Sequence, residues 1–283
     1  MDELEQLYRE HVKELASRYA AALGKAGYDA VLVHAGSPKI RSSFDDQYWS
    51  LRVTPHFQHW LPLAIADCGL LVQPGKTPVV YENVHRDFWE DPPAPESEHF
   101  RRVLDVVELE NPDLVREMLP QGVKIAYVGE DLARGATWGI PEDRRNPKEL
   151  AAALDSVRVV KTPYEIHCLT EANRRAAAGH RTVLDAFRAG DFSELEMQLE
   201  YLRATGQDDP ETPYKNIVAL DEHAATLHHV SYGRKRTAAH TLLLDRDAGK
   251  AGETNLTAGA AGRLAKDARA KRLALSHIPF YAN

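Results

Sequence analysis

The chain has 283 residues, of which 43% are apolar and 27% are charged, and its 35 basic and 42 acidic side chains give a formal net charge of −7. This length allows one large domain or two smaller ones, the composition excludes intrinsic disorder, and the acidic balance argues against nucleic acid as a partner. No window approaches the ~18 consecutive apolar residues of a membrane span, and the acidic start Asp-Glu-Leu-Glu is unlike a signal peptide, so we expect a cytoplasmic protein.

The first predicted element is a helix. Apolar residues recur every three or four positions over residues 4–23, which indicates one buried stripe and a charged opposite face, and Gly24 and Gly27 are expected to end the helix. Residues 28–34 follow as Tyr-Asp-Ala-Val-Leu-Val-His, a β-branched apolar run typical of a strand buried on both faces. A helix followed by such a strand favours an α/β architecture.

Further strand patterns follow along the chain. Residues 69–72 and 78–81 lie on either side of a Pro-Gly turn and indicate a hairpin. Residues 106–109 and 124–128 repeat the strand pattern with a helical segment between them, which is a βαβ-like succession. The proline-rich segment 90–98 cannot form a helix or a central strand, because proline lacks the amide donor, and is expected to be a surface loop.

A change of pattern marks a domain boundary. Residues 147–156 predict a helix, and the sequence Thr-Pro-Tyr-Glu at 162–165 is a capping box that predicts a long helix beginning at Pro163. A second helix is expected to begin after Ser193. Because two successive helices replace the alternation of strands and helices, we place the boundary near residues 156–162.

Few residues suggest chemistry by themselves. Residues 241–245, Thr-Leu-Leu-Leu-Asp, predict a buried strand whose terminal Asp245 is either a metal ligand or simply the cap of the following turn. His228 is either a site residue or a half-buried strand histidine. His56 and His59 are expected to be surface or interface histidines, because the residues between them give neither a helix nor a glutamate base.

Several longer motifs occur in a fixed order. They are Val33-His-Ala-Gly36, Phe44-Asp-Asp46, Lys161-Thr-x-x-Glu165 and Thr212-Pro-Tyr-Lys-Asn-Ile-Val-Ala-Leu-Asp-Glu-His223. Together they resemble bacterial Xaa-Pro dipeptidases, the prolidases of the creatinase/aminopeptidase P superfamily, from about residue 1 to Asp245. The resemblance implies an α/β N-terminal domain over residues 1–156 that mediates homodimerisation, followed by the first part of an α+β pita-bread catalytic domain over residues 157–245.

The resemblance also implies an activity and its residues. Such enzymes hydrolyse dipeptides with a C-terminal proline, using two Mn²⁺ ions bridged by two Asp, one His and two Glu and a metal-bound hydroxide as nucleophile. By position, Asp245 matches the first metal-binding aspartate, and His228 matches a catalytic-pocket histidine that contacts substrate. Tyr214 matches a substrate-pocket tyrosine, and Asp46 resembles the N-terminal-domain residue that reaches the partner subunit's site.

The resemblance stops after Asp245. Leu256 stands eleven residues later, where the second metal-binding aspartate belongs, and the remaining ligands have no match before Asn283. Residues 246–283 form a divergent tail with ten alanines and seven basic against three acidic side chains, which suggests an altered reading frame. One carboxylate beside Arg246 cannot hold two metal ions, so we expect neither tight Mn²⁺ binding nor dipeptidase activity from this chain alone. The alternative is a non-catalytic dimerising remnant of a prolidase.

An incomplete catalytic domain has a structural consequence. Strand 241–245 would become an unpaired edge beside exposed apolar surface. We expect the tail to dock over this edge, with residues 263–275 as a short basic helix, or chains to associate with one another; the alternative is local disorder.

Overall fold

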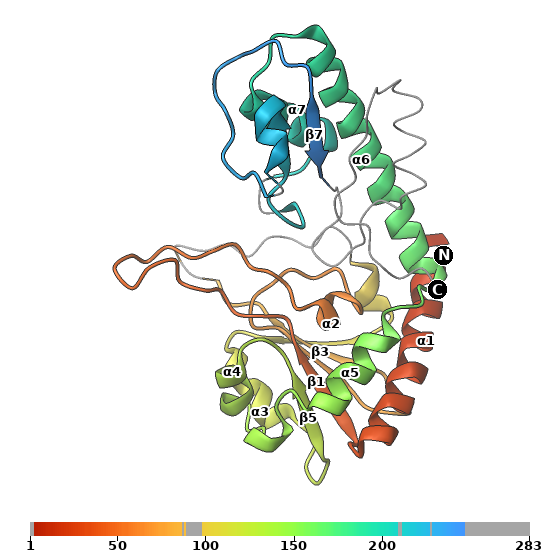
Figure 1. Ribbon diagram of the computed structural model, residues 1–283. Coiled ribbons are helices and arrows are strands. Elements are labelled where there is room, and N and C mark those ends of the chain that lie inside the picture. Colours follow the sequence, from red (N-terminus) through yellow and green to blue (C-terminus); the bar gives the residue numbers. More distant parts are fainter. Residues whose placement is uncertain (1–2, 87, 89–97, 209–210, 227, 247–283) are drawn as a thin grey trace. The chain divides into compact units, whose positions relative to one another are not determined.

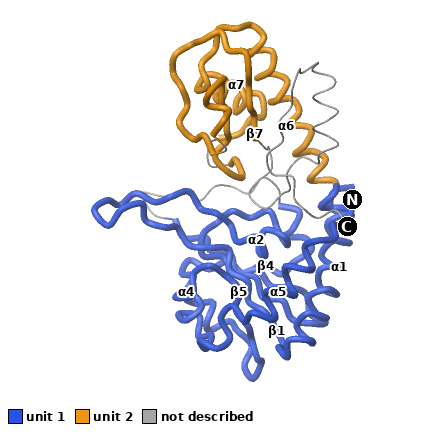
Figure 2. The backbone as a smooth tube through the Cα atoms, in the orientation of Figure 1, with its two compact units in different colours: residues 1–166 blue, residues 167–283 orange. Residues whose placement is uncertain are grey.

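The computed structural model divides into two compact units, residues 1–166 and 167–283 (Figures 1 and 2). The structure describes residues 3–86, 88, 98–208, 211–226 and 228–246. The loop expected at residues 90–98, apart from its last residue, and the tail with its expected helix at 263–275 lie outside the described residues. Each unit is described below by itself.

Unit 1 is built around a five-stranded sheet in the order β4-β3-β2-β1-β5. The strands are β1 (Ala30–His34), β2 (Gly69–Val72), β3 (Val79–Asn83), β4 (Asp105–Leu109) and β5 (Ile125–Val128). β2 pairs antiparallel with both β1 and β3, which confirms the expected hairpin. β5 pairs parallel with β1, and β4 pairs parallel with β3. β4 and β5 therefore lie at opposite edges of the sheet and do not form one βαβ unit, although they follow each other along the chain.

Helices cover both faces of this sheet (Figure 1). The helices are α1 (Glu3–Ala26), α2 (Pro55–Gln58), α3 (Val115–Met118), α4 (Leu132–Thr137) and α5 (Lys148–Val157), and the 3₁₀ turns are η1 (His99–Arg102), η2 (Pro112–Leu114) and η3 (Glu142–Arg144). α1 continues through Gly24, one of the two glycines that were expected to end it. It ends before Gly27, whose φ of 71° ends the helical path.

The central strand β1 is buried along its whole length, as its apolar run predicts. Val31 and Val33 face the core that α1 and α5 close, whereas Ala30 and Leu32 face a second core that contains Val115 and Trp138. Successive strand residues point to opposite faces, so a strand with a core on both sides must be apolar at every position.

The long helix α6 (Pro163–Ala189) begins where the capping box predicts. The Thr162 amide donates to Glu165 Oε2 (2.8 Å), and the Glu165 amide donates to Thr162 Oγ1 (3.3 Å). His11 of α1 adds a third contact: its Nε2 donates to the carbonyl oxygen of His59 (2.7 Å), so its Nδ1 accepts the hydroxyl hydrogen of Thr162 (2.7 Å). The first helix of unit 1 thereby orients the residue that caps α6.

His56 and His59 were expected to be surface or interface histidines, and the structure contradicts the surface alternative. The two side chains are 13% and 4% exposed, and their Nε2 atoms lie 3.0 Å from Asp155 Oδ1 and 3.4 Å from Glu165 Oε1, respectively. A carboxylate near each ring allows the histidines to be buried beside the ends of α5 and α6.

Unit 2 packs two helices against a two-stranded ribbon. α7 (Glu194–Thr205) begins with a capping box at Ser193 and ends at Gly206, as the sequence predicts. β6 (Ile217–Leu220) pairs antiparallel with β7 (Leu242–Asp245), and the 3₁₀ turn η5 (Asp221–Ala225) follows β6. β7 was expected to be buried, but all four of its residues are only half-buried, because β6 is the only strand that pairs with it within the described part of the chain.

The buried His11 makes the stability of unit 1 depend on pH. Burial lowers the pKa of His11 from 6.5 to about 4. As the pH falls below 6.5 the unfolded chain takes up the proton first, so stability is lost between about pH 6.5 and 4, by at most about 3 kcal/mol. His11→Gln removes this titration, and we expect a flatter stability curve in that window. All four tryptophans lie in unit 1, so fluorescence-monitored urea unfolding measures it.

His85→Gln, which changes an exposed histidine of unit 1, is the matched control and should keep the wild-type pH dependence. Parallel stability curves for wild type and His11→Gln would show that His11 does not titrate in this way.

Gly179 of α6 tests the packing of unit 2. A Cβ at this position would lie 2.6 Å from Tyr201 Cε2 and 2.7 Å from Thr205 Cγ2. We expect Gly179→Ala to destabilise unit 2 by about 1–3 kcal/mol, because the clash outweighs the gain in helix propensity. A Cβ added at Gly24 of α1 would meet no atom within 4 Å, so Gly24→Ala should stabilise unit 1 by about 0.5–1 kcal/mol. Circular dichroism during urea unfolding measures both, and a Gly179→Ala variant as stable as Gly24→Ala would contradict the packing argument.

Candidate functional site

Two of the four residues predicted for the site lie together at one end of the β6–β7 ribbon. The Tyr214 hydroxyl donates a hydrogen bond to Asp245 Oδ1 (2.7 Å). Asp245 stands opposite Ile217 in the ribbon, so the residues just before β6 lie beside the end of β7. The structure thus pairs the proposed metal ligand with the proposed substrate-pocket tyrosine.

A buried cation follows Asp245 directly. Arg246 is 4% exposed, its guanidinium lies over the Tyr201 ring at 4.7 Å, and its Nη1 donates to the carbonyl oxygen of Met197 (3.4 Å). Burial lowers the pKa of Arg246 to about 10. His180 of α6 donates from Nε2 to the carbonyl oxygen of Arg246 (3.3 Å). The residue after Asp245 in the sequence is therefore a buried arginine that packs on Tyr201.

This neighbourhood does not fit the pair of Mn²⁺ ions that the resemblance implies. A dinuclear centre needs several deprotonated ligands in one place. Within the described ranges, Asp245 is not part of any group of three or more metal-binding side chains. One of its oxygens accepts the Tyr214 hydroxyl, and Leu256 occupies the sequence position of the second aspartate.

The other two predicted residues lie elsewhere. His228 is exposed in unit 2 and does not belong to the group of metal-binding side chains found there. Asp46 is exposed in unit 1, where its Oδ1 accepts a hydrogen bond from Gln47 Nε2 (3.3 Å). Their roles in substrate binding remain predictions.

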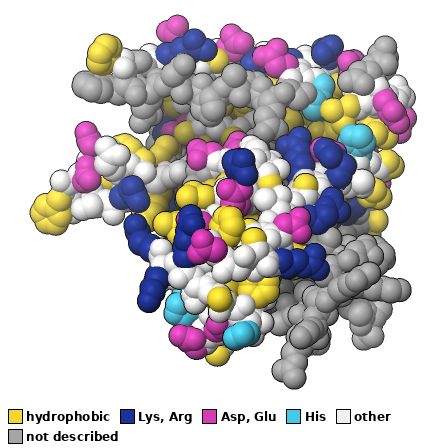
Figure 3. All heavy atoms as spheres, turned by 90° about the horizontal axis from the view of Figure 1, so that it is seen from above, with side chains coloured by type: hydrophobic (Ala, Val, Ile, Leu, Met, Phe, Trp, Pro, Cys, Tyr) yellow, Lys and Arg dark blue, Asp and Glu magenta, His cyan; other side chains and the backbone are white. Residues whose placement is uncertain are grey.

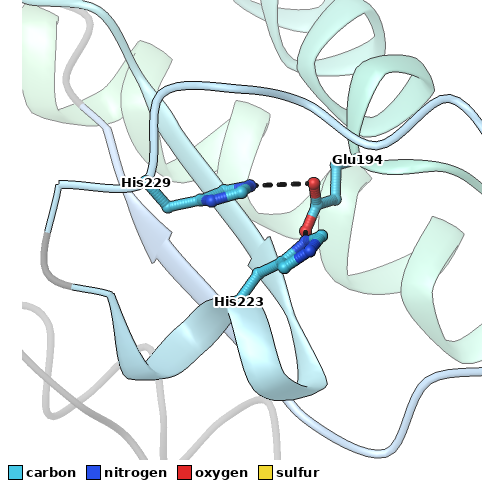
Figure 4. Close-up of side chains that lie close together, drawn as sticks. All are labelled: Glu194, His223 and His229. Atoms are coloured by element: carbon cyan, nitrogen blue, oxygen red, sulfur yellow. Dashed lines mark hydrogen bonds and ion pairs between the residues drawn. The ribbon is translucent and has the colours of Figure 1, made fainter.

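A different cluster forms at the other end of the β6–β7 ribbon (Figure 4). Glu194, the first residue of α7, is 2% exposed and accepts four hydrogen bonds. Its Oε1 accepts from the Leu220 amide (2.8 Å) and from His223 Nδ1 (2.8 Å). Its Oε2 accepts from the Gly233 amide (2.6 Å) and from His229 Nε2 (3.0 Å). We call Glu194, His223 and His229 the Glu194 cluster.

The electrostatics of the Glu194 cluster favour an ionised carboxylate. Burial raises the pKa of Glu194, but the hydrogen bonds from two backbone amides and two histidines outweigh it and bring the pKa below its usual value. The hydrogen bond with Glu194 raises the pKa of His223. The rings of His223 and His229 stack at 4.4 Å with an angle of 22° between their planes. The cluster therefore presents one carboxylate and two imidazoles at a single point.

Sequence reasoning missed this cluster. It assigned chemistry to His228, whereas the neighbouring His229 contacts Glu194, and it took the start of α7 only as a helix terminus. Glu194 lies 29 residues before His223, so no local spacing connects them. The only signal in the sequence is that two histidines follow closely on the apolar run Ile217–Leu220.

No helix among the described residues combines the length and the apolar character needed to cross a membrane.

Residues 6–155, more than half of the chain, match the family described as Xaa-Pro dipeptidase, N-terminal domain.

Two curated relatives extend the similarity beyond this domain. A Xaa-Pro dipeptidase from Marinobacter nauticus is 39% identical over 237 residues, which cover 83% of this chain and 53% of that protein. A Xaa-Pro dipeptidase from Cronobacter sakazakii is 34% identical over 286 residues, which cover 97% of this chain and 64% of that protein. The chain thus spans between half and two thirds of the length of these relatives.

Solved structures agree on the fold. Aminopeptidase P from E. coli with the inhibitor Pro-Leu superimposes with a TM-score of 0.63 at 16% identity, covering 86% of this chain and 60% of that one. Proline aminopeptidase P II from Yersinia pestis gives a TM-score of 0.61 at the same identity and coverage. The architecture is therefore an N-terminal α/β domain followed by the first part of a pita-bread domain, and the chain belongs to the Xaa-Pro dipeptidase, or prolidase, family.

Proposed function

We propose that this chain forms the N-terminal domain and the opening part of the catalytic domain of a Xaa-Pro dipeptidase, with domain limits at 1–156 and 157–245 and a divergent tail at 246–283. Dipeptides with a C-terminal proline are the substrate class, because the curated relatives are Xaa-Pro dipeptidases. We further propose that this polypeptide alone does not hydrolyse them.

The environment of Asp245 carries the proposal of inactivity. In a complete site, two Mn²⁺ ions would activate a water molecule and polarise the scissile carbonyl. Here Asp245 is the one residue that matches a metal ligand, its Oδ1 accepts the Tyr214 hydroxyl, and a guanidinium follows it. One carboxylate leaves most coordination positions of a metal ion to water, which does not support tight binding.

The remaining predicted residues have roles in binding. Tyr214 holds the carboxylate of Asp245 in place through its hydroxyl. We propose that His228, which is exposed, contacts the substrate when the rest of a catalytic domain is present. Neither side chain replaces a missing metal ligand. Tyr214 contacts Asp245, and His228 would contact the substrate.

The homodimer is part of the same proposal, and its support lies in unit 1. Residues 37–50, here called the arm, extend away from the sheet between β1 and α2 and are drawn in orange in Figure 1. Ile40 and Tyr48 form an antiparallel bridge, and the Arg41 amide donates to the carbonyl oxygen of Gln47 (2.8 Å). The Arg41 guanidinium lies over the Trp49 ring at 4.4 Å. The arm is thus an ordered hairpin-like extension.

The tip and sides of the arm are apolar and exposed. Phe44 is 98% exposed, and Trp49, Ile40 and Tyr48 are each at least half exposed, at 58%, 51% and 50%. Figure 3 shows hydrophobic side chains beside acidic ones on this protruding segment. Large aromatic residues that gather on an exposed segment are typical of interaction surfaces. We assign a second copy of this chain as the partner. Asp46 lies on the arm and would reach the partner subunit's site.

The activity proposal predicts no turnover. Purified chain, incubated with Mn²⁺ and Gly-Pro or Leu-Pro, should release no more proline than a blank, because one carboxylate cannot assemble the dinuclear centre. Bound manganese, measured by elemental analysis after desalting, should be the same in wild type and Asp245→Asn. The Marinobacter nauticus relative, assayed in parallel, is the positive control. Turnover together with about two bound metal ions per chain would overturn the proposal.

The dimer proposal predicts that the arm controls assembly. Phe44→Ser combined with Trp49→Ser should weaken self-association by about 10-fold or more, because buried aromatic residues carry much of the energy of an interface. Sedimentation velocity over a range of concentrations measures the effect. Val159→Ser, which changes a 74% exposed residue of unit 1 outside the arm, should leave assembly unchanged. A monomeric wild type, or a dimer that tolerates both arm substitutions, would exclude the arm as the interface.

A further inference from the structure

We propose that Glu194, His223 and His229 form a binding site for a single divalent transition-metal ion, with Zn²⁺ as the preferred ion. This site is separate from Asp245. Leu220, whose amide holds Glu194, stands opposite Leu242, whereas Asp245 stands opposite Ile217 at the other end of the β6–β7 ribbon. The inference does not depend on the function proposed for the chain.

The donor atoms already converge. One oxygen of Glu194 and one ring nitrogen each of His223 and His229 all lie within 4.8 Å of one another. The two histidine nitrogens lie 2.8 and 3.0 Å from the carboxylate oxygens. A tetrahedral zinc ion with bonds of about 2.0–2.1 Å places neighbouring ligand atoms roughly 3.4 Å apart. Small movements of the two rings are therefore enough to admit an ion between them and Glu194.

The types of donor select the ion. Two imidazole nitrogens and one carboxylate oxygen are a ligand set that Zn²⁺ accepts, with water in the fourth position. Ca²⁺ and Mg²⁺ prefer sites made entirely of oxygen, and Cu⁺ prefers sulfur ligands. Zn²⁺ also binds nitrogen ligands more tightly than Mn²⁺ does.

The carboxylate is held in place for this role. The amides of Leu220 and Gly233 each donate to one oxygen of Glu194. These two bonds persist when the ion binds, because they use different lone pairs from those that face the histidines. Hydrogen bonds that fix a ligand from outside the coordination sphere raise metal affinity. The ionised state of Glu194, favoured by these amides, removes the need to lose a proton there.

The histidine protons must move for the ion to bind. In the structure each ring donates a hydrogen bond to Glu194, from Nδ1–H of His223 and from Nε2–H of His229. A metal ion needs the lone pairs of these same nitrogens. A neutral His223 then carries its proton on Nε2, and a neutral His229 carries its proton on Nδ1; a doubly protonated ring releases one proton to solvent.

His223 is the most exposed of the three side chains. Its side chain is 46% exposed, whereas those of His229 and Glu194 are 12% and 2% exposed. The ion would therefore approach over His223, with the open coordination position towards solvent. His223→Ala removes an exposed ligand and disturbs the buried carboxylate less than a substitution of Glu194 itself.

Calorimetric titration of the full chain with Zn²⁺, after chelator treatment and desalting, tests the proposal. We expect one ion per chain at the cluster. His223→Ala and His229→Ala should each weaken Zn²⁺ binding by more than about 10- to 100-fold. Roughly that loss of metal affinity follows when a residue that only hydrogen-bonds to a metal ligand is removed, and here a ligand itself is removed. His240→Ala, an exposed histidine of the same unit, and Asp245→Asn should keep the wild-type affinity. Circular dichroism verifies that each variant is folded.

A measurement on the wild type needs no substitution. In long-range ¹H–¹⁵N spectra, Zn²⁺ should shift Nδ1 of His223 and Nε2 of His229 and leave the His240 resonances in place. Zn²⁺ binding that leaves these nitrogens unshifted, or that survives in the His223→Ala/His229→Ala double variant, would overturn the proposal, as would the absence of binding. These experiments do not measure activity. A result that excludes the Zn²⁺ site therefore leaves the proposal that the chain is inactive untouched, and the reverse also holds.

Discussion

Unit 2 depends on one buried anion. An ionised carboxylate removed from water is unfavourable by several kcal/mol unless its lone pairs are filled, and the four donors around Glu194 fill them. The capping box at Ser193 places Glu194 in the first turn of α7, where the helix dipole also favours a negative charge. This one side chain thereby joins the end of β6, the turn η5 and the segment around Gly233 to the start of α7.

The β6–β7 ribbon separates two kinds of chemistry. At one end, Asp245, the proposed metal ligand, accepts a hydrogen bond from the Tyr214 hydroxyl, and the residue that follows it, Arg246, is buried. At the other end, Glu194 and two histidines form a nitrogen-and-oxygen donor set on a fixed scaffold. Membership of a family of metallopeptidases therefore does not identify which end of this ribbon holds a metal ion; the identity and arrangement of the donors decide that.

Local signals in the sequence predict much of the fold. Capping boxes predict the starts of α6 and α7, and the continuous apolar run of β1 predicts a strand between two cores. Contacts between distant segments explain the failures. His59 is buried because Glu165 lies beside it, and β7 is half-exposed because only β6 pairs with it in the described chain. The Glu194 cluster joins residues 29 and 35 positions apart, a distance at which no periodic pattern operates.

The bond between His11 and Thr162 links residues 151 positions apart, and α1 packs against α5 near the end of unit 1. At a synthesis rate of about 5–20 residues per second, the ribosome needs roughly 7–27 s after the first helix is complete to reach Thr162. During that interval α1 can contact only the part of its core that is already made, such as Trp60, whose carbonyl oxygen accepts the Tyr8 hydroxyl. The part of α1 that packs against α5 therefore stays uncovered until the last elements of unit 1 have been made.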